Sequence, residues 1–252
     1  MKYLAFLDIL GFKELVENNE LEELEKLYEK LEGSVLYSMA HTNPDHRLSN
    51  KEGLPGIEET NLNSMIISDS IILWTDDDGQ GSFLELILAV KYFMFHSIQS
   101  GFPLRGAISC GELLMKNGLR ERSPKFNSYT TMLGPALTKS YILEGKSNWA
   151  GCIIDTECIS HFNEKYSEYE DQNVADIELF ESINLLKKFK TPMKSGEIEE
   201  YQTINWSEFG GIQLTEDAVR NSFSEHNKSV DDWAVESKIQ NTLAYLREVV
   251  SN

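Results

Sequence analysis

The sequence contains little cysteine, and its cysteines are not arranged in pairs. The 252 residues include three cysteines, Cys110, Cys152 and Cys158, and no CxxC motif. An odd number of unpaired cysteines is typical of a reducing compartment, so we expect a cytoplasmic protein without disulfides. The chain length suits one large domain, or one domain with additions.

The sequence also lacks a long apolar run. No such run approaches the roughly 20 residues that a membrane-spanning helix needs. The opening residues MKYLAFLDILGF are apolar, but they contain Asp8 and no small-residue cleavage site. We therefore expect neither a signal peptide nor a membrane anchor.

Basic residues are scarce. The chain has 23 Lys and Arg against 41 Asp and Glu, which gives a formal net charge of −18. So acidic a surface repels nucleic acid and anionic lipid, and neither is expected as a partner. A site for an anionic ligand such as a triphosphate would need metal ions or locally placed Lys and Arg.

Apolar runs and helical periodicity predict strands that alternate with helices. Residues 62–75 hold two β-branched runs around Ser68, Asp69 and Ser70, which predicts a hairpin with Asp69 at its tip. Residues 42–60 are expected to form a loop, and residues 163–190 show no clear pattern. The fold class is therefore α/β or α+β. We expect strands at 3–10, 104–110, 150–154 and 198–206, and helices at 14–39, 82–100, 134–145 and 230–250.

Two carboxylates are candidates for chemistry. Asp8 lies at the end of an apolar strand, where a carboxylate cannot ionise without a partner. Taken alone, Asp8 could equally cap the helix that follows, and Asp69 could be an ordinary turn residue. Together they could converge on a pair of divalent cations, since Mg²⁺ is usually held by one or two carboxylates and substrate phosphates.

Two further motifs could bind phosphate. Arg105 stands in PLRGAISCGEL, on a strand otherwise built of small and apolar residues. It could also be a surface arginine whose charged end reaches water. Gly134 and Pro135 begin the helix expected in LGPALTKSYILEG. The free N–H groups at its start could bind phosphate, or this could be an ordinary helix N-terminus.

In this order the four motifs resemble the catalytic domain of class III nucleotidyl cyclases, over about residues 3–155. The second motif keeps Asp69, with Ser68 in place of Gly. The fourth motif departs most, because Thr138 replaces Asn and Ile142 replaces the family's transition-state Arg. The positions that match the family pattern are Phe6, Asp8, Ile9, Gly11, Phe12, Asp69, Arg105, Ile108, Gly111, Gly134 and Leu137.

The resemblance implies an α+β fold. A ferredoxin-like βαββαβ catalytic domain would occupy residues 1–210, and a C-terminal extension of helix and strand, residues 211–252, would pack on it. Class III domains pair head to tail, so the resemblance also implies a homodimer with its sites at the interface.

The resemblance also implies roles for individual residues. Asp8, Asp69 and the Ile9 carbonyl would hold two Mn²⁺ or Mg²⁺ ions per site. Arg105 would contact the triphosphate, and Lys194 in KSGEIEEY would be the late phosphate-binding Lys of the family, with Lys190 behind it. Lys139 could supply the charge that Ile142 lacks, or a residue of the other protomer could. The nucleotide-binding set would be Met65, Thr131, Gly134, Thr138 and Lys194.

The base-reading positions favour a pyrimidine. Met65 and Thr131 stand where adenylate cyclases have a Lys and an Asp that read adenine. Neither can make those charged contacts, and the single hydroxyl of Thr131 suits the edge of a smaller base.

The motifs FLDILGFK, SDSIILW, LRGAISCG and GPAL also resemble those of the bacterial pyrimidine cyclases of Pycsar anti-phage systems. This implies a uridylate cyclase, with UTP favoured over CTP, whose cyclic nucleotide activates a separate effector. The alternatives are an adenylate or guanylate cyclase, a catalytically inactive nucleotide-binding homologue, and a structural domain in which each motif is a cap or a turn.

Overall fold

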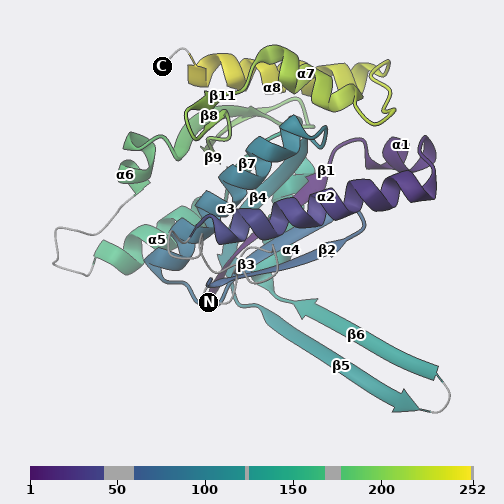
Figure 1. Ribbon diagram of the computed structural model, residues 1–252. Coiled ribbons are helices and arrows are strands. Elements are labelled where there is room, and N and C mark those ends of the chain that lie inside the picture. The colour runs from purple at the N-terminus through teal and green to yellow at the C-terminus, as the bar shows by residue number, and fades with distance from the viewer. Residues whose placement is uncertain (43–59, 123–124, 168–176, 251–252) are drawn as a thin grey trace.

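The computed structural model describes residues 1–42, 60–122, 125–167 and 177–250 (Figure 1). The loop expected at 42–60 lies almost wholly outside these ranges. The helices are α1 (Phe12–Glu17), α2 (Leu21–Ala40), α3 (Gln80–Gln99), α4 (Pro135–Lys146), α5 (Thr156–Ser167), α6 (Ile177–Ser182), α7 (Glu216–Ser224) and α8 (Trp233–Val250). The strands are β1 (Lys2–Ile9), β2 (Leu62–Ile67), β3 (Ser70–Thr75), β4 (Leu104–Gly111), β5 (Leu114–Arg122), β6 (Lys125–Leu133), β7 (Cys152–Ile154), β8 (Leu186–Pro192), β9 (Ile198–Ile204), β10 (Glu208–Phe209) and β11 (Ile212–Gln213).

Seven strands form one sheet in the order β2-β3-β1-β4-β7-β9-β8. Neighbouring strands are antiparallel except β4 and β7, which are parallel. The first four strands and helices α2 and α3 form a ferredoxin-like βαββαβ unit with strand order β2-β3-β1-β4. The α+β class is therefore confirmed, and a parallel α/β sheet is excluded.

Alternate residues of β1 enter two different apolar clusters. Tyr3, Ala5 and Leu7 belong to the main core, together with residues of α2 and α3. Leu4 and Phe6 point to the opposite face, where α4 packs on β1 and β4. Because side chains alternate along a strand, the next residue on the α4 face is Asp8.

The helix expected at 14–39 is two helices. Helix α1 ends at Glu17 and α2 begins at Leu21. The side-chain amide of Asn19 donates to the Leu15 carbonyl at 2.7 Å and to the His226 carbonyl at 2.8 Å. An asparagine side chain that bonds the backbone in this way competes with helix continuation, which explains the break.

Strands β5 and β6 pair with each other and project from the body as a two-stranded arm (Figure 1). No element was predicted for this part of the sequence. The arm leads directly into α4, so it determines which end of the sheet that helix starts from.

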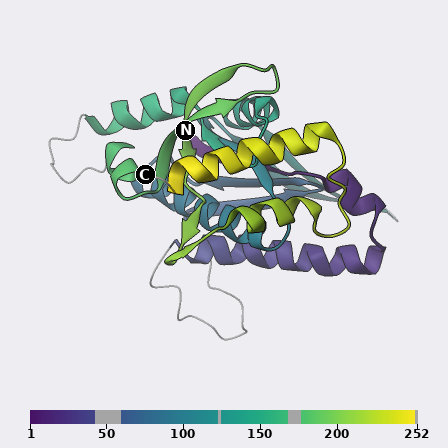
Figure 2. The ribbon, with the colours of Figure 1, turned by 90° about the horizontal axis from the view of Figure 1, so that it is seen from above.

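The C-terminal helices pack into the same core as the rest of the chain. The Tyr245 hydroxyl of α8 donates to the Ile204 carbonyl at 2.9 Å, and its ring lies 4.7 Å from that of Trp149. Helix α7 packs between α8 and α3, as the view from above shows (Figure 2). The helix predicted at 230–250 is confirmed.

Helix α3 alone among the described helices has the length and apolarity of a membrane span. Of its most apolar stretch, 67% is buried inside the fold, as expected of a core helix. All three cysteines are free and buried, so they fill space in the interior.

Candidate active site

Asp8 lies at the end of β1, which runs between β3 and β4 in the sheet. It pairs in register with Ser70 of β3 on one side and with Arg105 of β4 on the other. The Arg105 Nη2 atom donates to Asp8 Oδ2 at 3.1 Å. Helix α1 starts after Gly11 without a side-chain cap, so the interpretation of Asp8 as a helix cap is wrong.

Asp69 occupies the tight turn between β2 and β3, so the predicted hairpin is confirmed. Ser68 precedes it with φ of 57°, a left-handed conformation that two-residue hairpin turns use. The backbone N–H of Ile9 donates to the Asp69 carbonyl at 3.0 Å, and the Tyr28 hydroxyl donates to the Ser68 carbonyl at 2.8 Å. These bonds hold the turn beside the end of β1, next to Asp8.

Arg105 is buried between two carboxylates. It is 8% exposed, and besides Asp8 it pairs through Nε with Glu144 of α4, which is 3% exposed. Arg105 is therefore not a surface arginine. Glu144 was not singled out from the sequence, although it stands four residues after buried Ser140 and eight after buried Ala136. A charge at that spacing on an apolar helix face signals a buried ion pair.

The surroundings of Asp8 favour cation binding. Burial first, and then the charge of Glu144, raises the pKa of Asp8 to about 7. Arg105 opposes this rise, Asp69 adds a smaller one, and Lys194 lowers the pKa slightly. Burial is the larger cause of the raised pKa of Asp8, and a divalent cation would relieve the part that comes from the negative charges of Glu144 and Asp69.

Lys194 lies in the turn between β8 and β9, which packs against the end of α4. Its N–H donates to the Lys146 carbonyl at 2.7 Å, so the turn is fixed against the end of α4. Partial burial and then Arg105 lower the pKa of Lys194, while Glu144 and Asp8 raise it. The chain thus brings Lys194 within electrostatic range of Asp8.

Three predicted residues of α4 lie elsewhere in the same chain. The Ser109 hydroxyl donates to the Ala136 carbonyl at 2.6 Å, so α4 starts near the far end of β4 and ends at Arg105. Gly134 and Thr138 therefore lie away from Asp8, and Lys139 pairs with Glu157 of α5. Lys139 does not lie at the Asp8 of its own chain. The arm of β5 and β6 leads into α4 near the C-terminal end of β4, whereas Asp8 pairs with Arg105 at the start of β4.

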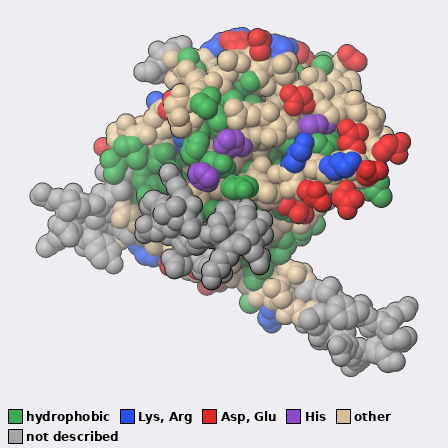
Figure 3. All heavy atoms as spheres, viewed as in Figure 1, with side chains coloured by type: hydrophobic (Ala, Val, Ile, Leu, Met, Phe, Trp, Pro, Cys, Tyr) green, Lys and Arg blue, Asp and Glu red, His purple; other side chains and the backbone are tan. Residues whose placement is uncertain are grey.

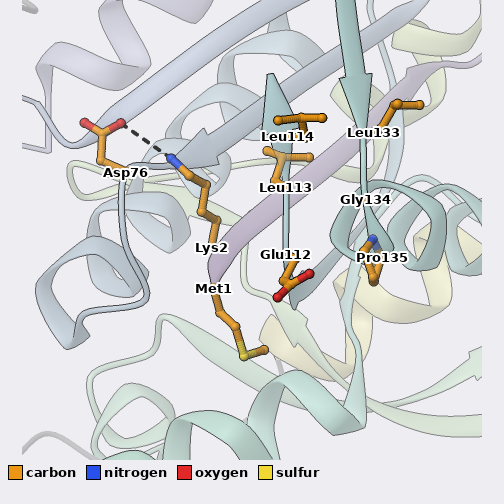
Figure 4. A pocket seen from close by; sticks show the side chains of 9 residues that line it. All are labelled: Met1, Lys2, Asp76, Glu112, Leu113, Leu114, Leu133, Gly134 and Pro135. Atoms are coloured by element: carbon orange, nitrogen blue, oxygen red, sulfur yellow. Dashed lines mark ion pairs between the residues drawn. The ribbon is translucent and has the colours of Figure 1, made fainter. Parts of the chain in front are cut away.

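Gly134 has a structural role of its own. A Cβ atom there would lie 2.2 Å from the Glu112 carbonyl oxygen, so only glycine allows this close approach. Gly134 lines an open cavity of ≈ 520 Å³, where Lys2 pairs with Asp76 at 3.9 Å (Figure 4). Lys2 begins β1, so this cavity lies about 20 Å from Asp8 along the strand.

Of the two predicted base-reading residues, Met65 lies by the smaller apolar cluster on the α4 face, and Thr131 lies on β6 opposite Lys116 of β5. Met65 packs against this cluster, and so does Met132, the neighbour of Thr131 on β6. Ile142, at the position of the missing family Arg, is 52% exposed, and Tyr141 beside it is 59% exposed. The Tyr141 ring lies 5.4 Å from that of Phe6, so the face that carries Asp8 leaves apolar side chains partly uncovered.

The donor set suits an ion that arrives with a phosphate ligand. Within the described ranges, no three His, Cys, Asp or Glu side chains gather as a metal cage. Asp8, Asp69 and the Ile9 carbonyl supply hard oxygen atoms, which is the number and type that Mg²⁺ uses when substrate phosphates complete its shell. These residues fit a metal that binds together with a nucleotide.

No protein-family model matches the chain, and no curated protein has a matching sequence. Two solved structures of a bacterial light-regulated adenylyl cyclase are similar in fold, with TM-scores of 0.49 and 0.45 and sequence identities of 12% and 13%. They match 90% and 98% of this chain, which spans 56% and 57% of theirs. At this level of identity the similarity concerns the fold alone.

Proposed function

We propose that this protein is a class III-type nucleotide cyclase that converts UTP, in preference to CTP, into the 3′,5′-cyclic monophosphate and pyrophosphate. The observation that carries this proposal is the meeting of Asp8 and Asp69 at one end of the sheet. Arg105 and Lys194 lie beside them, so metal-binding carboxylates and phosphate-binding cations share one site.

In this proposal Asp8, Asp69 and the Ile9 carbonyl hold two Mn²⁺ or Mg²⁺ ions. Such ions, when bound, activate the 3′-hydroxyl and neutralise the leaving pyrophosphate. Arg105 and Lys194 bind the triphosphate, and Glu144 keeps the Arg105 guanidinium in place. Fixed charges of this kind stabilise the charge that develops in the transition state.

The reaction is an in-line displacement at the α-phosphorus. A bond forms between the ribose 3′-oxygen and this phosphorus as the bond to the pyrophosphate oxygen breaks, and the hydroxyl proton is released. Phosphoryl chemistry of this kind needs positioning and charge stabilisation from the protein.

Two observations support a homodimer with sites at the interface. Gly134 and Thr138 lie at the start of α4, towards the far end of β4 from the Asp8 of the same chain, and Lys139 pairs with Glu157. Tyr141 and Ile142 leave apolar area exposed on the same helix, which marks it as an interaction surface. A head-to-tail partner would bring its Met65 and Thr131, together with Gly134, Thr138 and Lys139, to the site.

The uncharged pair Met65 and Thr131 supports a pyrimidine substrate, since neither can make the charged contacts that read adenine. We further propose that the product is a cytoplasmic second messenger of anti-phage defence that acts on a separate effector.

A second candidate is a nucleotide-binding homologue without activity. Ile142 lacks the charge of the family Arg, and Arg105 already neutralises Asp8. A protein of this kind would bind the triphosphate and release no product.

The test is to incubate the purified protein with Mn²⁺ and each of ATP, GTP, CTP and UTP, and to identify cyclic monophosphates by mass spectrometry. We expect cyclic UMP, with less cyclic CMP. Cyclic AMP or cyclic GMP as the main product would retain a cyclase but contradict the roles given to Met65 and Thr131. UTP binding without any product would favour the inactive homologue.

A further inference from the structure

Helix α8 is fixed to the end of the sheet that carries the site. The backbone N–H of Ala150 donates to the Thr242 hydroxyl of α8 at 2.8 Å. The next residue, Gly151, accepts from the N–H of Gly106 at 2.8 Å, and Gly106 directly follows Arg105 on β4. Two hydrogen bonds thus link α8 to the start of β4.

Lys238 lies one turn before Thr242 and shares its helix face. It lines a small cavity of ≈ 50 Å³ with Leu10 and Gly11, the residues that follow β1. In two perpendicular views the start of α8 lies at the same end of the molecule as α1, which begins just after Gly11 (Figures 1 and 2). The C-terminal helix therefore brings a lysine to the end of the strand that carries Asp8.

Three basic side chains lie within electrostatic range of one another near the end of β1. Burial and then Arg105 lower the pKa of Lys238, so the two cations lie within electrostatic range of each other. Lys238 and Arg105 also both lower the pKa of Lys194. Glu144, Asp8 and Asp232 offset part of the repulsion among these like charges, and an anion bound among the three cations would remove the rest.

The Lys238 ammonium is available for a ligand. It donates to the Ala234 carbonyl of its own helix at 3.1 Å, and within the described part of the chain it forms no ion pair. An ammonium group has three donors, so two of those of Lys238 have no described partner. Arg105, by contrast, is occupied by Asp8 and Glu144.

We propose that Lys238 binds the polyphosphate of the nucleotide at this site, so that the C-terminal helix is part of the binding machinery. The identification of the anion as a nucleoside triphosphate rests on the proposed function. The anion site itself is argued from the convergence of Arg105, Lys194 and Lys238. This role gives the segment after residue 210 a part in substrate binding.

The test is calorimetric titration of the full-length protein with inorganic tripolyphosphate in the presence of Mn²⁺. We expect Lys238→Gln to weaken binding about ten-fold, the effect of losing one charge-assisted contact, and Lys238→Arg to retain most of the affinity. Arg247→Gln is the matched control, because it removes the same charge from the far end of α8, where Arg247 pairs with Glu216. Melting temperatures are measured for every variant, and titrations are run well below them.

Equal affinity in the wild type and in Lys238→Gln would overturn the inference, as would a wild type that does not bind tripolyphosphate. An equal loss in Arg247→Gln would also overturn it, by showing a general effect of charge. A wild type that binds tripolyphosphate through Lys238 but forms no cyclic nucleotide would contradict the proposed function alone. If the cyclase activity is present, Lys238→Gln is expected to raise KM for the triphosphate more than it lowers kcat.

Discussion

At the scale of single residues, the site depends on how Arg105 is held. Its guanidinium lies between Asp8 and Glu144, both largely removed from water. A buried ion pair of this kind adds little net stability, but removing one partner leaves the other charge uncompensated. If Arg105 exchanges Asp8 for a substrate phosphate, its ion pair with Glu144 keeps the guanidinium buried and charge-compensated.

Glu144→Gln tests this arrangement. We expect the free energy of unfolding to fall by about 2 kcal/mol, because Arg105 loses one of its two charged partners. Glu157→Gln is the control, since Glu157 pairs with Lys139 at the exposed surface and its loss should leave stability unchanged. Chemical denaturation measures both variants, and equal effects would contradict the special role of the buried pair.

Asp8→Asn tests the raised pKa of Asp8. A carboxyl whose pKa is about 7 in the folded protein, against an ordinary value of 3.8, stabilises the fold when protonated, and this contribution is lost as pH rises from about 4 to 7. Without metal ions, the wild type should lose about 1–2 kcal/mol more than Asp8→Asn between pH 5 and pH 8, a value reduced for the partial exposure of Asp8. Denaturation at several pH values checks this, and parallel profiles would contradict it.

Mn²⁺ affinity should follow the same ionisation. The cation competes with the proton on Asp8, so binding to the wild type should strengthen as pH rises towards 7 and then level off. Titration calorimetry in buffers of different ionisation enthalpy would detect the released proton. Binding that does not change between pH 6 and pH 8 would contradict Asp8 as a ligand.

At the scale of elements, the sequence was most informative where apolar runs are short and end sharply. Strand β1 and the hairpin around Asp69 follow from β-branched runs and a polar turn, so the two carboxylates could be predicted to lie together. Predicting that Asp8 and Asp69 lie side by side also required the antiparallel pairing of β1 with β3, which the family resemblance implied.

Other elements could not be predicted because their determinants are not local. The arm of β5 and β6 pairs only with itself and carries no strong alternation. The break between α1 and α2 depends on Asn19, whose side chain bonds a residue 207 positions away. Glu144 and Lys238 reach the site through packing of α4 and α8 against the sheet, so their roles became visible only in the structure.

Tyr245→Phe tests whether α8 folds together with the sheet. The buried Tyr245 hydroxyl donates to the Ile204 carbonyl, and losing this bond should lower the free energy of unfolding by about 1–2 kcal/mol in a single transition. Tyr141→Phe is the control, because Tyr141 is 59% exposed. An early, separate transition for α8 in the calorimeter would contradict a common core.

At the scale of the whole molecule, the site gathers basic residues beside the carboxylates of Asp8, Asp69 and Glu144 in a protein that is acidic overall. The net charge is −18, and acidic side chains gather over the end of the molecule where α1 and the start of α2 lie (Figure 3). Arg105, Lys194 and Lys238 lie within electrostatic range of one another at this same end, among those acidic side chains. An anionic substrate is therefore attracted by these cations at short range, while the acidic surface around them repels polyanions.

The proposed dimer predicts complementation between inactive variants. Asp69→Ala removes a metal ligand, and Thr131→Arg obstructs the part of the site that the partner supplies. If each site uses both chains, random mixing should restore about a quarter of wild-type activity, since about half of the dimers then carry one intact site. Product formation after mixing and refolding measures this, and no recovery would show that each chain builds its own site.

The central claim is that Asp8 and Asp69 together hold the metal ions of a nucleotide cyclase. The most direct measurement is Mn²⁺-dependent formation of cyclic UMP by the wild type, Asp8→Asn, Asp69→Ala and the control Asp76→Asn, whose carboxylate lies at the other end of the same hairpin. The account predicts that both site variants lose activity by several orders of magnitude while the control keeps it. Product formation that persists without Asp8 or Asp69 would contradict the account.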